Sequence, residues 1–160
     1  RAYLGEPGIG IVAVLSVISV IVMVLGYRAA DGPVYWGRNP MWVGINNLLM
    51  VLAFYFYAAS GAKDAKIWLG TKVRHPQLTG FSIWAVAHLL VNGDLPSFVL
   101  FGGLLAWAIV EVLLINGQEG PWEAPPRAPF KKEIVAIVIT AVVLVVVMGI
   151  HYALGVTPWG

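Results

Sequence analysis

The chain has 160 residues, of which 59% are hydrophobic and only 11% are charged, and its formal net charge is +2. With a mean hydropathy of +0.83, this composition excludes a soluble domain, which needs far more polar surface at this size. The small positive charge does not indicate nucleic-acid binding. We therefore expect an all-α fold, a polytopic membrane helix bundle that forms a single integral membrane domain over residues 1–160 and contacts membrane lipid.

Five apolar stretches predict five transmembrane helices. They cover residues 8–27, 41–60, 78–93, 96–116 and 134–154. The first has about 20 residues without a charge, enough at about 1.5 Å per residue to cross a hydrocarbon core of about 30 Å. Backbone amides cannot stay unpaired in lipid, so such stretches must be helical. The third and fourth helices should form a tight hairpin, because Asn92-Gly93-Asp94 supplies a turn and Pro96 suits the first position of a helix.

The basic residues are distributed unevenly between the segments that join these helices. If the loop from Lys63 to Arg74 is cytoplasmic, only Arg28 and Arg38 lie outside. The residues then placed inside are Arg1, Lys63, Lys66, Lys72, Arg74, Arg127, Lys131 and Lys132. Because basic residues favour the cytoplasmic side of a membrane protein, this bias predicts that the Lys63–Arg74 loop is cytoplasmic.

Two histidines are candidate ligands of a metal or a cofactor. His88 lies midway along the third predicted helix, with Phe81 and Trp84 on roughly the same face. His151 lies near the end of the fifth helix, so both histidines should be near the outer side. Because a neutral imidazole offers a lone pair, the two could ligate one metal ion or one haem, with Trp84 against the cofactor. The alternative for each is a histidine hydrogen-bonded to a helix carbonyl or to water.

Arg74, His75 and Glu111 form a predicted polar cluster at the inner side. Pro76 opens the third helix and holds His75 in an extended conformation, which leaves both basic side chains at the interface. Glu111 lies at the corresponding depth of the fourth helix and could pair with either of them. A carboxylate within a membrane span is a functional hypothesis with a named partner, and a structural ion pair is the plainer interpretation.

The residues around these candidates resemble a known family. The central block reads Arg74-His75-Pro76-Gln77-Leu78, then Gly80, Trp84, Ala87-His88-Leu89-Leu90 and Asn92-Gly93-Asp94. It is similar to the RHPxLxG…W…AHLLxNGD signature of the NnrU membrane family, to which plant 15-cis-ζ-carotene isomerase is related. Further matching blocks are residues 1–6, Asp31-Gly32-Pro33 with Trp36, and His151 with Gly155-Val156 and Pro158. The resemblance covers nearly the whole chain, and its central block is specific.

The resemblance implies a six-helix bundle in a bacterial inner membrane, of which this chain would lack the first helix. The start at Arg1, without an initiator methionine, leads to the same expectation of an upstream segment; simple removal of a methionine is the alternative. The related plant isomerase carries haem b, and its proposed axial histidine carries over to His88. The family's other proposed ligand belongs to the absent helix, so His151 is a substitute candidate. The implied activity is a redox-dependent isomerisation of a carotenoid or another hydrophobic substrate, or a role linked to nitrite and nitric oxide.

Two other classes of protein remain open. Arg74-His75-Pro76 followed by glycine also resembles membrane methyltransferases that use S-adenosylmethionine. Those enzymes carry an arginine and paired glutamates after the next span, whereas Glu119 and Glu123 stand apart here. The other alternative is a non-enzymatic small subunit of a larger membrane complex, for which small residues such as Gly102, Gly103 and Ala106 would permit close helix contacts.

Overall fold

The computed structural model describes residues 5–61 and 65–159, and its side chains from Gly8 onward. Helices account for most of this part of the chain, as the all-α prediction requires. The predictions made for residues 1–4 and for Lys63 lie outside the described residues.

Four helical segments are long and apolar enough to cross a membrane, which identifies an integral membrane protein by length and composition. They are 21 to 25 residues long and cover Gly8–Ala29, Pro40–Ser60, Leu95–Glu119 and Phe130–Ala153. Four of the five predicted spans are thereby confirmed. The remaining prediction, 78–93, corresponds to helix α3 (Pro76–Val91), which has 16 residues. At about 1.5 Å per residue, α3 is about 24 Å long and shorter than a hydrocarbon core of about 30 Å.

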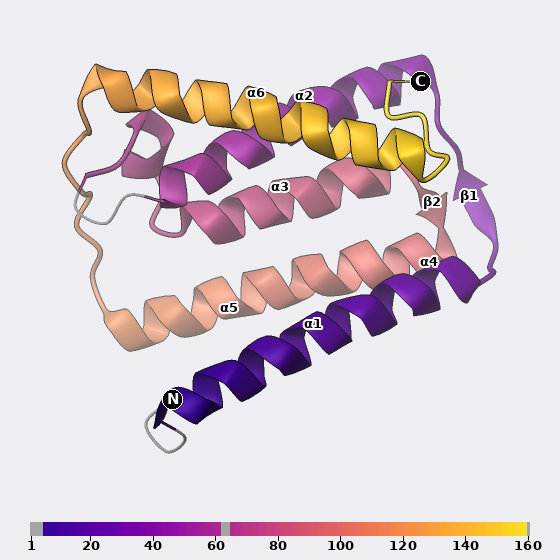
Figure 1. Ribbon diagram of the computed structural model, residues 1–160, viewed down its shortest axis with the longest axis horizontal. Helices are drawn as coiled ribbons and strands as arrows, with labels where there is room; N and C mark the ends of the chain where they lie inside the picture. The colour runs from indigo at the N-terminus through magenta and orange to yellow at the C-terminus, as the bar shows by residue number, and fades with distance from the viewer. Residues whose placement is uncertain (1–4, 62–64, 160) are drawn as a thin grey trace.

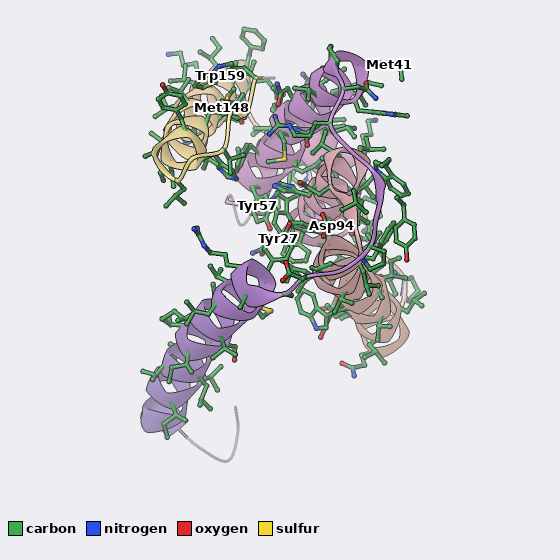
Figure 2. The ribbon with its side chains drawn as sticks, turned by 90° about the vertical axis from the view of Figure 1, so that its right-hand side faces the viewer. Tyr27, Met41, Tyr57, Asp94, Met148 and Trp159 are labelled. Atoms are coloured by element: carbon green, nitrogen blue, oxygen red, sulfur yellow. The ribbon has the colours of Figure 1, made fainter. Side chains whose placement is uncertain are left out.

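Helix α2 (Pro40–Ser60) lies at the centre of the bundle. It packs against α3 and against α6 (Phe130–Ala153), while α3 also packs against α5 (Gly103–Glu119). Helix α1 (Gly5–Ala29) lies at the outer edge of the bundle (Figure 1). Figure 2 shows that α1 leans away from the other helices and approaches them near Tyr27. Most apolar side chains of α1 face outward, where lipid covers them in a membrane.

Small residues allow α2 and α3 to approach closely. A Cβ atom on Gly80 would lie 2.7 Å from the carbonyl oxygen of Ala53 and 3.1 Å from the Cβ atom of Phe56. Ala53, Ala85 and Ala87 are at most 1% exposed. In lipid, where helices gain little from hiding apolar surface, such close packing supplies much of the stabilisation. Gly80 therefore fixes the distance between α2 and α3.

The predicted hairpin after α3 is present, with two additions. The carboxylate of Asp94 caps the next helix, because its Oδ1 accepts a hydrogen bond of 2.8 Å from the backbone N–H of Ser97. Two short strands, β1 (Val34–Trp36) and β2 (Gly93–Asp94), pair in antiparallel orientation at this turn. The predicted helix at 96–116 is also not uniform: α4 (Leu95–Ser97) leads into a π-helical turn, η2 (Phe98–Gly102), before α5 begins.

The opposite end of the bundle is closed by the connections before α3 and α6. A short 3-10 helix, η1 (Trp68–Thr71), precedes α3. Glu133, in the first turn of α6, is 9% exposed, and its Oε2 accepts a hydrogen bond of 3.0 Å from the backbone N–H of Trp68. Backbone bonds from Lys66 N to Pro126 O and from Ala128 N to Lys66 O join the two connections. We call this end the Arg74 end and the other the Asp94 end.

Candidate functional site

The structure brings His88 and His151 together at the Asp94 end. His88 comes from the last turn of α3 and His151 from the last turn of α6. Their ring centroids lie 6.4 Å apart, and the ring planes are inclined at 45°. The side chains thus lie at the same depth of the bundle, and they face each other from two helices that both pack on α2.

The hydrogen bonds of the two histidines define which nitrogen of each ring carries a proton. Nδ1 of His88 lies 2.9 Å from the carbonyl oxygen of Trp84, and Nδ1 of His151 lies 2.8 Å from that of Val147. A carbonyl only accepts, so each Nδ1 is the donor. In the neutral ring, Nε2 then keeps its lone pair, and this is the arrangement in which a metal-binding histidine is oriented by its other nitrogen.

Aromatic side chains enclose the His88 ring. Phe101 stacks on it with a centroid distance of 4.8 Å and an angle of 30°, and the Trp84 ring lies 4.8 Å away at 48°. Phe101 is 6% exposed and belongs to the π-helical turn η2. Such π-helical turns often occur at functional sites. This one places Phe101 against His88. Sequence reasoning identified Trp84 but missed Phe101.

His88 and His151 both line a cavity of about 100 Å³. Asn46 and Asn47 of α2 also line it. The Nδ2 group of Asn46 donates to Oδ1 of Asn47 over 3.1 Å, while Oδ1 of Asn46 is buried and has no hydrogen-bond partner among the described residues. Buried polar atoms are normally satisfied, so this acceptor leaves one unmet hydrogen bond in the cavity that the two histidines line.

The segment Asp31-Gly32-Pro33 with Trp36 contacts the turn Asn92-Gly93-Asp94 beside this cavity. The indole N–H of Trp36 donates to the carbonyl oxygen of Leu89 over 3.1 Å. The backbone of Gly93 passes so close to the same indole that a Cβ atom there would overlap the ring. The backbone N–H of Leu95 also donates to the carbonyl oxygen of Pro33 over 3.0 Å. The loop after α1 is therefore tied to the end of the helix that carries His88.

The chain after α6 folds back over the other side of the cavity. Gly155 adopts a positive φ of 86°, a conformation that glycine accepts without strain. The N–H of Val156 then donates to the carbonyl oxygen of His151 over 2.9 Å, the pattern of a Schellman helix end. Arg38 donates to the carbonyl oxygen of Thr157. As a result, Val156 and Pro158 also line the cavity.

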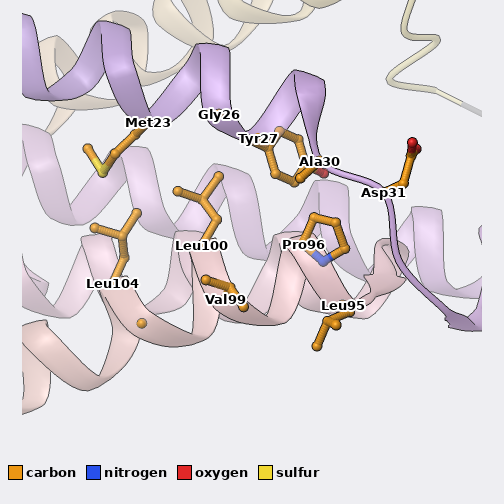
Figure 3. A pocket seen from close by; sticks show the side chains of 11 residues that line it. Met23, Gly26, Tyr27, Ala30, Asp31, Leu95, Pro96, Val99, Leu100 and Leu104 are labelled. Carbon is orange, nitrogen blue, oxygen red and sulfur yellow. The ribbon is translucent and has the colours of Figure 1, made fainter.

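A second, larger cavity of about 520 Å³ separates α1 from the hairpin (Figure 3). Its walls are mainly apolar and include Met23, Leu100 and Leu104. Tyr27 closes the gap toward the first cavity: its hydroxyl lies 2.9 Å from Oγ of Ser97, and its ring contacts Phe101 edge-on at 5.8 Å. Phe101 thus lies between the apolar cavity and the histidine site.

At the Arg74 end, the predicted polar cluster has different pairings. Arg74 forms a 2.9 Å salt bridge with Glu119 and donates to the carbonyl oxygen of Gly120 over 2.7 Å. His75 donates from Nε2 to Oδ1 of Asn116 over 3.0 Å. Among the described residues, Glu111 forms an ion pair with neither of them, because α5 extends two further turns and supplies closer partners. Arg74, His75 and Glu111 nevertheless line one cavity of about 460 Å³.

The fold and the site together define an integral membrane helix bundle with a paired-histidine site at one end. The chain belongs to the NnrU protein family, whose model matches residues 1–158. No curated protein sequence and no solved structure matches the chain.

Proposed function

We propose that this chain is a haem-binding membrane protein in which His88 and His151 would hold the iron of one haem b. The observation that carries the proposal is the 6.4 Å between the two ring centroids. Two imidazoles at this separation are close enough to share one metal ion. The spacing of this pair is therefore suited to one iron between the rings.

The residues around the pair support the same assignment. Each Nδ1–H is held by a helix carbonyl, which leaves Nε2 as the ligating atom. Trp84 and Phe101 supply flat apolar surfaces next to His88. Arg38 lines the cavity at its outer rim and offers a positive charge for an acidic substituent of the cofactor. These residues hold and orient the group, and the group itself supplies reversible one-electron iron chemistry.

The space between the rings sets a condition on this proposal. The cavity of about 100 Å³ is smaller than the roughly 300–1,000 Å³ typical of sites for ligands of this size. A macrocycle therefore enters only if the side chains that line the cavity move aside while the two imidazoles keep their spacing.

The apolar cavity beside α1 supports a hydrophobic substrate, such as a carotenoid. Its volume of about 520 Å³ lies within the range of small-molecule sites, and its walls are apolar. Tyr27 lines this cavity and contacts Phe101, which in turn stacks on His88. A redox-dependent isomerisation of such a substrate is the activity that we propose, and a role linked to nitrite or nitric oxide is the second candidate, which uses the same iron.

For the location, we propose the bacterial inner membrane with the Arg74 end in the cytoplasm. The basis is the excess of basic residues in the segments at that end, together with the positive-inside rule. The paired histidines then lie near the outer side.

The direct test is the visible spectrum of the purified chain after expression with haem supply. A Soret band, together with a pyridine haemochrome of the b type, supports the proposal. A protein that folds and contains a metal ion without porphyrin contradicts the haem assignment. A protein with neither group favours the alternatives, a small structural subunit or a methyltransferase, and added S-adenosylmethionine then separates these two by its effect on the thermal midpoint.

A further inference from the structure

The cavity at the Arg74 end combines opposite charges with apolar walls. Its volume is about 460 Å³. The side chains that line it include Lys66, Arg74, His75, Trp107, Glu111 and Ile115. The haem proposal gives none of these residues a role.

Glu111 is the unusual member of this set. It lies within a membrane-crossing segment, Leu95–Glu119, and among the described residues it has no hydrogen-bond or ion-pair partner. Carboxylates within membrane spans are costly and generally face a partner or a polar cavity. A bound ammonium group would supply the missing partner.

The positive side of the cavity is held in place by the protein. Arg74 is anchored by Glu119 and by the carbonyl oxygen of Gly120. These contacts use two of its five N–H donors, and the planar guanidinium is well suited to phosphate. Lys66, whose ammonium donates to the carbonyl oxygen of Ser60, adds a second positive charge. One cavity therefore presents a carboxylate and two basic groups.

The apolar part of the wall continues along α5. Trp107, Glu111 and Ile115 follow one another at intervals of four residues, which places them on one face of the helix. Trp107 is 49% exposed and faces outward, where acyl chains lie. A ligand whose charged end occupies the cavity can thus extend an apolar part along this face.

We propose that this cavity binds the headgroup of a phospholipid that carries a primary amine, such as phosphatidylethanolamine. Its phosphate lies against Arg74 and Lys66, its ammonium against Glu111, and its acyl chains along Trp107 and Ile115. A purely anionic headgroup should bind less well, because it would leave Glu111 unpaired and next to a negative charge.

The test compares lipids added to the delipidated full chain in detergent. Dioleoyl-phosphatidylethanolamine should raise the thermal midpoint by several degrees, and dioleoyl-phosphatidylglycerol, which has no amine, should raise it less. In Glu111→Gln the difference between the two lipids should disappear, each shift being measured against the same variant without lipid. Glu123→Gln, an exposed glutamate outside the cavity, is the matched control and should keep the difference.

Native mass spectrometry of the same samples gives a second measurement. We expect one phosphatidylethanolamine retained by the wild-type chain and lost from Glu111→Gln. Equal effects of the two lipids on the wild type, or an unchanged preference in Glu111→Gln, would overturn the proposal. Soluble glycerophosphoethanolamine identifies the source of the headgroup: if it stabilises as well as the lipid, the cavity takes a free phosphoamine and the assignment to a lipid is wrong.

Discussion

His88 and His151 face each other across 6.4 Å between ring centroids, and each ring donates its Nδ1–H to the carbonyl oxygen four residues earlier in its own helix. The two contacts are the same on α3 and α6. Each helix thus orients its own imidazole, and the relative position of the helices sets the distance between the rings. A substitution that moves α3 should therefore change the distance between the two imidazole rings.

The close approach of α2 and α3 at Gly80 leads to the first prediction. Gly80→Ala places a methyl group 2.7 Å from the Ala53 carbonyl oxygen, so the helices must move apart, and we expect a loss of about 1–3 kcal/mol in unfolding free energy. Gly44→Ala in α2 is the control, because nothing lies within 4 Å of its Cβ position. A thermal midpoint of Gly80→Ala no lower than that of Gly44→Ala would show that this contact does not set the helix distance.

The contact between Trp36 and Gly93 leads to a second prediction. Gly93→Ala inserts a methyl group into the space of the indole ring and should lower the thermal midpoint. Trp36→Ala removes the ring, so the additional cost of Gly93→Ala in that background should be much smaller. The double-mutant cycle measures this coupling directly. Additive effects of the two substitutions would argue against the contact.

Glu133 provides a third prediction at the Arg74 end. Glu133→Ala leaves the backbone N–H of Trp68 without its acceptor, which we expect to cost about 1–3 kcal/mol. Glu133→Gln keeps an oxygen that can accept and should restore most of the stability. Glu123→Ala, at an exposed position, should leave the thermal midpoint unchanged. If the Ala and Gln variants at Glu133 are equally unstable, the hydrogen bond is not what stabilises this end.

The orientation in the membrane can be tested by cysteine labelling because the chain has no cysteine of its own. Lys72 and Tyr35 are exposed and lie at the Arg74 end and the Asp94 end, respectively. In intact cells, an impermeant thiol reagent should label Tyr35→Cys and should label Lys72→Cys only after the membrane is opened. The reverse pattern would mean that the Arg74 end is outside.

Much of the fold could be predicted because its determinants are local. Apolar length and the hairpin turn defined four of the helices, and depth along α3 and α6 placed His88 and His151 at the same end. Their role as ligands stays a prediction. Helix α3 is 16 residues long, the same length as the predicted range 78–93, but it begins two residues earlier, at Pro76, and ends before the extended Asn92.

The features that escaped prediction depend on contacts between distant segments or on departures from regular geometry. Strands β1 and β2 form only because Trp36 meets Gly93, and neither short segment has a strand pattern of its own. The π-turn shifts the helical phase, so the regular spacing used for the sequence did not place Phe101 against His88. Arg74 forms its salt bridge with Glu119 and not with Glu111 because α5 continues past Glu111.

The measurement that most directly tests the paired-histidine site is the reduced-minus-oxidised visible spectrum of four proteins: wild type, His88→Ala, His151→Ala and His75→Ala. His75 is the matched control because its Nε2 donates to Asn116 and it lies at the opposite end of α3. We predict that either His88→Ala or His151→Ala abolishes or shifts the Soret and α bands, while His75→Ala leaves them in place. Unchanged spectra in the His88 and His151 variants would contradict axial ligation by this pair.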